Sequence, residues 1–119
     1  MQVCQLFADT VTVYRTDGKQ VFRQVLMGCN MQMQSCIEPH VSGNRVRKDF
    51  TLFIPGPKEY VLPGDLIFRG IGPVISMTQW PEFIPAAVPE LVQAEYIQPF
   101  YLYGTLHHTE VGSMRKNWR

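Results

Sequence analysis

Two adjacent histidines, His107 and His108, are the first residues in this chain that could do chemistry. Imidazole nitrogens bind transition metals, but neighbouring side chains in an extended segment point to opposite faces. No further histidine or cysteine lies at the spacing of a zinc finger. We therefore predict a solvated polar stretch here, without a metal site.

A second grouping combines two cysteines with a histidine. Cys29 and Cys36 lie seven residues apart, and His40 follows four residues later. A reactive cysteine needs a basic partner that lowers its pKa, and the sequence identifies none. Together with Cys4 the cysteines number three, without metal-like spacing, so we expect reduced thiols in buried or loop positions, in a cytosolic setting.

Phosphate-binding and acid–base motifs are not apparent. Gly70-Ile-Gly72 is followed by Pro73 and not by the start of a helix, so it does not predict a phosphate cradle. The carboxylates are scattered along the chain, and no acid–base pair can be argued from them. We expect no enzymatic activity and no cofactor.

A basic cluster follows the Gly43-Asn44 pair. Arg45, Arg47 and Lys48 would face a phosphate backbone if they lined a channel or groove. The commoner use of such a short run is a solvated strand end, and the sequence leaves both interpretations open.

The C-terminal residues form a second candidate binding segment. Tryptophan and arginine are enriched at the hot spots of protein interfaces, whereas the alternative is a frayed terminus. A tryptophan in the penultimate position favours docking on a neighbouring subunit. The residues concerned are Met114, Arg115, Lys116, Trp118 and Arg119.

The elements that must position these residues begin with a hairpin. Asp17-Gly18 lies between two runs of strand-forming residues, and such a pair accepts the positive φ values of a tight turn. The alternation predicts strands over 10–15 and 21–28, with Val11 and Val13 on one face and Tyr14 on the other.

Further strands are expected over 49–54, with Phe50, Leu52 and Ile54 on one face, and over 66–69, after a turn at Pro63-Gly64-Asp65. Strands are also expected over 74–80 and 95–103, where Pro99 suggests an edge or a bulge. Residues 30–48 lose periodicity, which predicts a long loop or a loosely formed β excursion, and 81–89 could hold a helical turn. Residues 105–119 read as a polar tail. We therefore predict a single all-β domain over 1–119, a small barrel or sandwich.

The composition bounds the class of function. Charged residues make up 18% of the 119 residues, below the usual share of about a quarter. Such a chain either buries surface against partners or is an ordinary compact β domain. The net charge of +1 gives no global signal for a polyanion. We expect no signal peptide, no membrane span and no membrane partner.

Four segments in order carry a resemblance to a known class of protein: Asp9-Thr-Val-Thr-Val-Tyr14, Val25-Leu-Met-Gly28, Pro63-Gly-Asp-Leu-Ile-Phe-Arg-Gly70 and Gly112-Ser-Met-Arg-Lys-Asn-Trp118. This order resembles the small minor structural proteins of tailed bacteriophages of Gram-positive gut and soil bacteria. These are encoded beside the portal and major capsid genes.

The arrangement is also similar to the phage head–tail joining family, the head-closure or stopper proteins. That resemblance implies a small β-barrel in a ring below the portal and its adaptor, with a loop between strands two and three that projects towards the channel. Residues 30–48 match that loop. The proline-rich segment 81–89 has no clear counterpart in the family, so the resemblance leaves the neck layer open.

The resemblance implies a structural protein of the phage neck, found in the virion after assembly in the host cytoplasm. Its partners would be identical copies in a ring, the portal or adaptor protein, the tail terminator or tail tube, and packaged double-stranded DNA bound without sequence specificity. The alternatives are a tail terminator or minor tail protein, and a small nucleic-acid-binding barrel.

Overall fold

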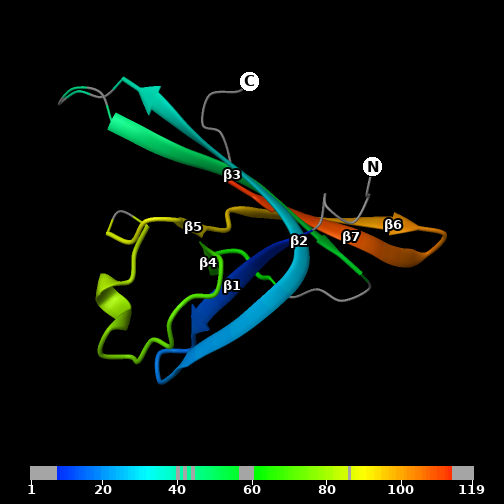
Figure 1. Cartoon of the computed structure of the whole chain (residues 1–119), viewed down its shortest axis with the longest axis horizontal. Coiled ribbons are helices and arrows are strands. Elements are labelled where there is room, and N and C mark those ends of the chain that lie inside the picture. Colours follow the sequence, from blue (N-terminus) through cyan, green and yellow to red (C-terminus); the bar gives the residue numbers. More distant parts are fainter. Residues whose placement is uncertain are drawn as a thin grey trace.

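The computed structural model describes residues 8–39, 41, 43, 45–56, 61–85 and 87–113, with the backbone alone at 35, 36, 38 and 45–48. Within this part of the chain the structure is all-β, as predicted (Figure 1). The elements are β1 (Asp9–Thr16), β2 (Val21–Glu38), β3 (Arg45–Pro55), β4 (Leu66–Arg69), the 3₁₀ helix η2 (Trp80–Glu82), β5 (Leu91–Gln93), β6 (Tyr96–Leu102) and β7 (Thr105–Gly112).

The strands form one antiparallel sheet in the order β5-β4-β1-β2-β3-β7-β6, which curls into a half-barrel (Figure 1). Strand β2 joins the two halves, because it pairs with β1 up to Cys29 and with β3 from Asn30 onwards. The change of partner coincides with Gly28, whose φ of +74° is a value that glycine adopts without strain. It also coincides with a register shift between Asp9 and Val11.

The β1–β2 hairpin confirms the turn predicted at Asp17-Gly18, but the turn is longer than a two-residue turn and is held by the side chain of Asp17. Thr16 pairs with Val21, so the loop has four residues. Gly18 has a φ of +93°, and Asp17 Oδ1 accepts hydrogen bonds from the backbone amides of Lys19 (2.8 Å) and Gln20 (2.9 Å). These amides, Gln20 first, lower the pKa of Asp17. The aspartate therefore caps the loop with its side chain.

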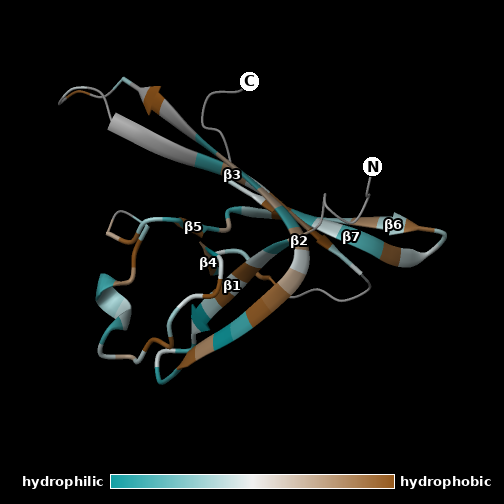
Figure 2. Ribbon diagram, in the orientation of Figure 1, coloured by the Kyte–Doolittle hydropathy of each residue, from teal (hydrophilic) through white to brown (hydrophobic). Residues whose placement is uncertain are grey.

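Alternation along the strands divides the apolar residues between two clusters. Val11 and Val13 of β1 face the inside of the half-barrel, as predicted, together with Phe50, Leu52 and Ile54 of β3. Figure 2 shows these apolar stretches along the ribbon. The full inner cluster is Val11, Val13, Leu26, Cys29, Met31, Phe50, Leu52, Ile54, Val61, Ile67, Val92, Ala94 and Val111.

The opposite face of β1 is covered by residues 70–85 and 87–90, which we call the strap. Tyr14 packs there with Leu66, Phe83 and Leu91. The ring of Phe83 meets the ring of Tyr14 edge-on, with the centroids 4.7 Å apart. The strap therefore gives the chain a second, smaller core.

Side chains of the sheet hold the strap by its backbone. Tyr14 Oη donates to the Pro73 carbonyl (2.6 Å), and Arg23 Nη2 donates to the Gly72 carbonyl (2.6 Å). The Thr12 hydroxyl donates to the Gly70 carbonyl (2.8 Å) and accepts from the Gly72 amide (2.9 Å).

The strand predicted over 74–80 is wrong: these residues are irregular and lead into η2. Gly72 and Pro73 end the extended segment. The carbonyls of Gly72 and Pro73 accept hydrogen bonds from side chains, whereas in a strand they would bond to a neighbouring strand. The helical turn suggested for 81–89 corresponds to η2, which begins at Trp80.

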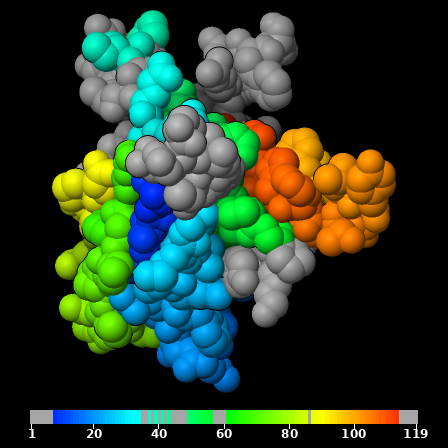
Figure 3. All heavy atoms as spheres, turned by 45° about the vertical axis from the view of Figure 1, so that its right-hand side comes forward, coloured from blue at the N-terminus to red at the C-terminus, as the bar shows by residue number. Residues whose placement is uncertain are grey.

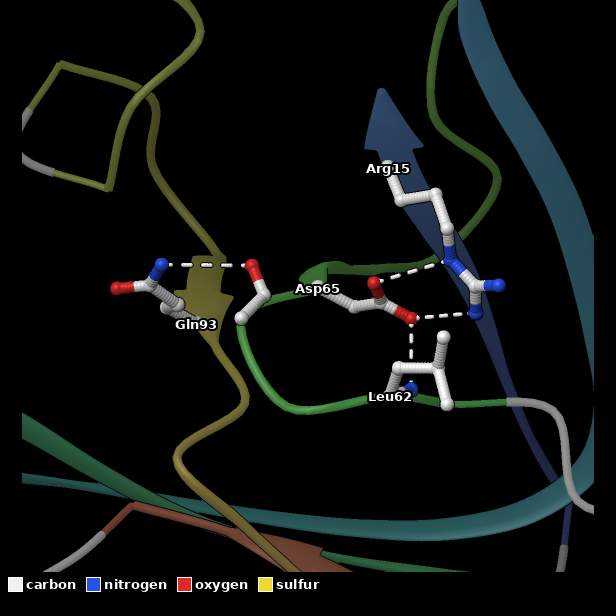
Figure 4. Close-up of polar contacts among 5 residues, drawn as sticks. Arg15, Leu62, Asp65 and Gln93 are labelled. Carbon is white, nitrogen blue, oxygen red and sulfur yellow. Dashed lines mark hydrogen bonds and ion pairs between the residues drawn. The ribbon is translucent and has the colours of Figure 1, made fainter. Parts of the chain in front are cut away.

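The turn predicted at Pro63-Gly64-Asp65 is confirmed and is fixed by its aspartate (Figure 4). The amide of Asp65 donates to the Leu62 carbonyl (3.1 Å), and the Leu62 amide donates back to Asp65 Oδ2 (2.9 Å). Gly64 has a φ of +93°, the value that the third position of a type II turn requires.

Of the two alternatives predicted for 30–48, the long loop is wrong and the β excursion agrees with the described residues. Residues 30–38 belong to β2 and 45–48 to β3, and the two strands share nine register pairs. The alternation is carried by Met31 and Met33, which pack inwards, and by Gln32 and Gln34, which are exposed. Methionine and glutamine are not typical strand formers, so the period of two was missed.

The polar tail predicted from residue 105 is also corrected. Residues 105–112 form β7, which lies between β3 and β6. Its buried residues include Leu106, Thr109 and Val111, and the polar residues between them in the sequence obscured the alternation. Strand β6 lies at the edge of the sheet formed by the described residues, so the edge position suggested by Pro99 is confirmed. A register shift follows between Phe100 and Tyr101. In the described residues, no helix has the length and hydropathy needed to cross a membrane.

Candidate interaction surfaces

The distal parts of β2 and β3 form a two-stranded ribbon that leaves the body of the sheet (Figure 1). We call residues 34–38 and 45–49 the arm. Strand β1 pairs with β2 no further than Cys29, and β7 pairs with β3 from Thr51 onwards. Within the described residues, both edges of the arm therefore lack a partner strand. Ile37, on the outgoing strand, is 72% exposed.

The structure places the predicted channel residues on the arm and not at a loop tip. Arg45, Arg47 and Lys48 lie on the returning strand, in register with Glu38, Cys36 and Ser35. The three basic positions therefore lie on one strand of a ribbon with open edges. The predicted docking residues Met114, Arg115, Lys116, Trp118 and Arg119 lie outside the described residues.

An aromatic row crosses the outer face of β3, β7 and β6. The His108 ring stacks on Phe100, with centroids 4.7 Å apart and planes at 16°, and Phe53 lies on its other side with a centroid distance of 6.1 Å. The three residues come from three adjacent strands of the sheet, where cross-strand neighbours approach closely.

Neighbouring residues in an extended segment are expected to point to opposite faces, but the side chains of His107 and His108 lie together. Phe100 pairs with His108 and Tyr101 pairs with Leu106, so His107 is the extra residue of a β-bulge. The bulge brings the two Nδ1 atoms to 3.0 Å. No group of three or more histidine, cysteine, aspartate or glutamate side chains in the described residues is placed to hold a metal.

A polar depression lies further along the same face. Tyr96 crosses above Gly112, where a Cβ atom would lie 2.7 Å from the ring, and its hydroxyl donates to Glu110 Oε2 (2.5 Å). Burial, followed by this contact with Glu110, raises the pKa of Tyr96 to about 12. The cavity measures about 350 Å³ and is lined by Gln32, Met33, Gln34, Asp49, Phe50, Thr51, Tyr96 and Ser113.

Cys29 and Ser113, which lie near these surfaces, have structural roles. Cys29 is a buried free thiol, and burial, with a smaller contribution from the charge of Asp9, raises its pKa to about 11. A thiol with this pKa is a poor nucleophile at neutral pH. Ser113 accepts a hydrogen bond from the Phe50 amide (3.1 Å). Cys4 and His40 lie outside the described residues.

The β6–β7 turn exposes four large side chains in a row: Phe100, Tyr101, Leu102 and Tyr103, which we call the tip. Tyr103 is 97% exposed and has a φ of +53°, and Gly104 has a φ of +80°. Two positive φ values in a two-residue loop fit the right-handed twist of the flanking strands. The pair Tyr103-Gly104 was the available sequence signal for this hairpin, and sequence reasoning missed it.

A second exposed apolar surface lies on the strap. Ile71, Val74 and Ile84 are exposed there, Val74 to 78%. Figures 1 and 3 show the strap and the tip on opposite sides of the molecule. The body of the chain therefore presents two separate apolar surfaces, in addition to the arm.

Comparisons with protein-family models, curated proteins and solved structures give no match to the chain. The function is therefore inferred from the three surfaces and from the residues that form them.

Proposed function

We propose that this chain is a structural subunit of a phage neck, a head-closure or head–tail connector protein without enzymatic activity. Copies of the chain would form a ring between the portal or adaptor protein and the tail terminator or tail tube. Packaged double-stranded DNA would pass through the lumen of that ring. The chain would enter the virion after assembly in the host cytoplasm.

The arm is the observation that carries this proposal. A two-stranded ribbon with open edges is at best marginally stable alone in water, and open edges invite pairing with other chains. An arm with both edges unpaired in the described residues and with exposed Ile37 therefore fits a segment that is covered in an assembly. Three basic positions on one strand suit a lumen that contacts DNA phosphates without reading bases.

The body supports the same proposal. Ring subunits bury their sides against identical copies, through contacts that join two different patches. The tip and the strap are two such patches, on opposite sides of a chain with few charges. Exposed apolar surfaces of this kind are typical of interaction sites.

The aromatic row favours a second candidate function, a small nucleic-acid-binding barrel. Proteins that bind single strands stack bases on aromatic side chains of a sheet face and neutralise the backbone with nearby cations. Phe53, His108 and Phe100 supply the aromatic part. Glu110, on the same face, is acidic. Arg23 lies on the other half of the sheet, where its guanidinium donates to the Gly72 carbonyl. The electrostatic support for nucleic-acid binding is therefore weaker than the aromatic support.

Removing the protein from the phage that encodes it tests the main proposal. We expect DNA-filled heads that fail to join tails or that lose their genome, and a ring at the neck of complete particles in cryo-electron microscopy. Intact, tailed, DNA-filled particles without the protein would contradict the proposal. Retention of the protein on free tails would instead identify a tail terminator or minor tail protein. Salt-dependent binding of single strands by the isolated monomer would favour the nucleic-acid-binding barrel.

The role of the arm is tested separately. The triple variant Arg45→Ala, Arg47→Ala, Lys48→Ala should assemble into particles that release DNA more readily, because phosphate contacts in the lumen are lost. The double variant Lys19→Ala, Arg69→Ala removes two exposed cations away from the arm and should behave as wild type. Unchanged DNA retention in the triple variant would rule out a DNA-contacting arm.

A further inference from the structure

We propose that the tip of one copy docks on the strap of the next copy, in a head-to-tail contact. This deepens the proposed function, since it names the surfaces that would join neighbouring subunits of the ring. The contact itself is a property of the isolated chain and can be tested without a phage.

The tip has the chemistry of a protein-binding anchor. Residues 96–106 contain no charged side chain, and aromatic side chains gain large contact areas at a low cost in conformational entropy. The two-residue turn at Tyr103-Gly104 closes directly on the pair Leu102–Thr105, so the tip is ordered before it binds. A rigid apolar projection of this kind loses little freedom on association.

The strap offers a matching surface. Residues 70–90 contain neither lysine nor arginine, and their two charged side chains are Glu82 and Glu90. Hydrogen bonds from Thr12, Tyr14 and Arg23 fix the strap backbone at Gly70, Gly72 and Pro73, beside the exposed side chains of Ile71 and Val74. The strap is therefore a preformed apolar surface with an acidic margin, whereas the groups that flank the tip are the imidazoles of His107 and His108.

A second copy of the chain is the occupant that these observations favour. Head-to-tail contacts join two different patches, and such patches must lie apart on one molecule, as the tip and the strap do (Figure 3). Nucleic acid and anionic membranes are disfavoured, because neither segment contains lysine or arginine, and the Arg23 guanidinium beside the strap is engaged by the Gly72 carbonyl.

Site-directed cross-linking tests the geometry. In a Cys4→Ser, Cys36→Ser background, in which Cys29 is buried, we would mix the full-length variants Thr105→Cys and Thr78→Cys with a short bismaleimide. Both threonines are exposed, one beside the tip and one on the strap, and their replacement leaves the apolar side chains of both surfaces in place. We expect a cross-linked dimer in the mixture, and higher oligomers from the variant that carries both cysteines. A mixture of Thr105→Cys with Met27→Cys, which lies on neither surface, should give none. A dimer from Thr105→Cys alone, or no dimer in the first mixture, would overturn the proposal.

The variant Tyr103→Asn separates association from folding. Asparagine before glycine is the preferred pair for a turn with two positive φ values, so the hairpin should fold at least as well as in the wild type. Loss of the exposed ring should weaken self-association at least about tenfold in sedimentation velocity, as expected for an aromatic hot spot. Unchanged association with an intact fold would overturn the tip as the docking element.

These outcomes are distinguishable from failure of the proposed function. Cross-linking of tip to strap in a protein that is absent from phage particles would keep the contact and reject the neck. A protein found at the neck that gives no tip-to-strap cross-link would keep the neck and reject this contact.

Discussion

The guanidinium of Arg15 binds the carboxylate of Asp65 through two contacts, from Nε to Oδ1 at 3.1 Å and from Nη2 to Oδ2 at 2.7 Å (Figure 4). The two residues are fifty positions apart, and Asp65 is only 4% exposed. The Asp65 carbonyl accepts a hydrogen bond from Ala94 (2.8 Å), so the same residue links β1, the turn before β4 and the end of β5. This bidentate pair stabilises one half of the sheet.

Replacing Asp65 should therefore destabilise the fold. Asp65→Ala leaves the Leu62 amide and Arg15 without their shared acceptor, and we expect a loss of about 3 kcal/mol in the free energy of unfolding. Asp65→Asn keeps an acceptor for Leu62 and should cost less. Urea unfolding measures both. A change below about 0.5 kcal/mol in Asp65→Ala would show that the pair contributes little, as exposed pairs do.

The Gly72→Ala variant should disrupt the attachment of the strap. A Cβ atom at residue 72 would lie 2.1 Å from Tyr14 Oη, so the tyrosine must move and lose its hydrogen bond to Pro73. We expect a loss of about 1–3 kcal/mol, as is typical of overpacking. Adding Tyr14→Phe removes the clashing oxygen and should recover part of this loss, measured by thermal unfolding. Thr78→Ala, on the exposed side of the strap, should be neutral. Equal stability of Gly72→Ala and wild type would contradict the packing described.

The stability of the fold should fall between pH 10 and 12. Burial and Glu110 raise the pKa of Tyr96 from 10.0 to about 12, so in this interval the unfolded chain loses the phenol proton while the folded chain retains it. Raising the pH therefore favours the unfolded state. The variant Tyr96→Phe should show a shallower decline in the urea midpoint. The remaining slope should reflect Cys29 and Tyr14, because burial raises the pKa of both groups. Identical pH profiles for wild type and Tyr96→Phe would refute this.

The Cys29 thiol should react slowly with alkylating reagents. Its side chain is fully buried and its pKa is about 11, so both access and thiolate population are low at pH 8. Mass spectrometry would monitor alkylation of Cys29 in the Cys4→Ser, Cys36→Ser background. We expect the folded protein to be labelled at least about a hundredfold more slowly than the protein in urea. Labelling at the rate of the unfolded chain would show that this part of the core opens freely.

Amide hydrogens of the arm should exchange with solvent earlier than those of the β1–β2 pairing. Strand β1 has a neighbour on each side, whereas the arm lacks flanking strands in the described residues. Ribbons of this kind open locally at a low free energy. Hydrogen exchange with mass spectrometry on the isolated chain measures this directly. In the assembled ring the arm should become protected, and equal protection in both states would argue against its burial there.

The sequence predicted well wherever alternation was carried by typical strand formers. The spacing alone placed Val11 and Val13 on one face of their strand, and Phe50, Leu52 and Ile54 on one face of theirs. The structure confirms both sets and shows that both faces point inwards. Turn chemistry was equally local: Asp17-Gly18 and Pro63-Gly64-Asp65 were predicted from residue types, and both turns are present. Pro99 correctly indicated an edge strand.

The interaction surfaces were much less predictable. The basic positions Arg45, Arg47 and Lys48 were identified, but their place on an extended ribbon depends on pairing with 35–38, which no local pattern reveals. The contact between His107 and His108 required a bulge that is defined by the partner strand β6. The exposure of the tip and of Val74 depends on what the rest of the chain leaves uncovered.

By itself, the sequence determined the class of the fold, the inward faces of β1 and β3, and the places where the chain turns, because these follow from period-two alternation and from the backbone preferences of glycine, proline and aspartate. The tertiary structure alone decided how far β2 extends, that 105–112 is an internal strand, and that the strap covers Tyr14. These features depend on hydrogen bonds and packing between residues that are tens of positions apart, such as Tyr14 and Pro73. The free energy of such contacts depends on both residues, and a local sequence pattern does not identify the distant one.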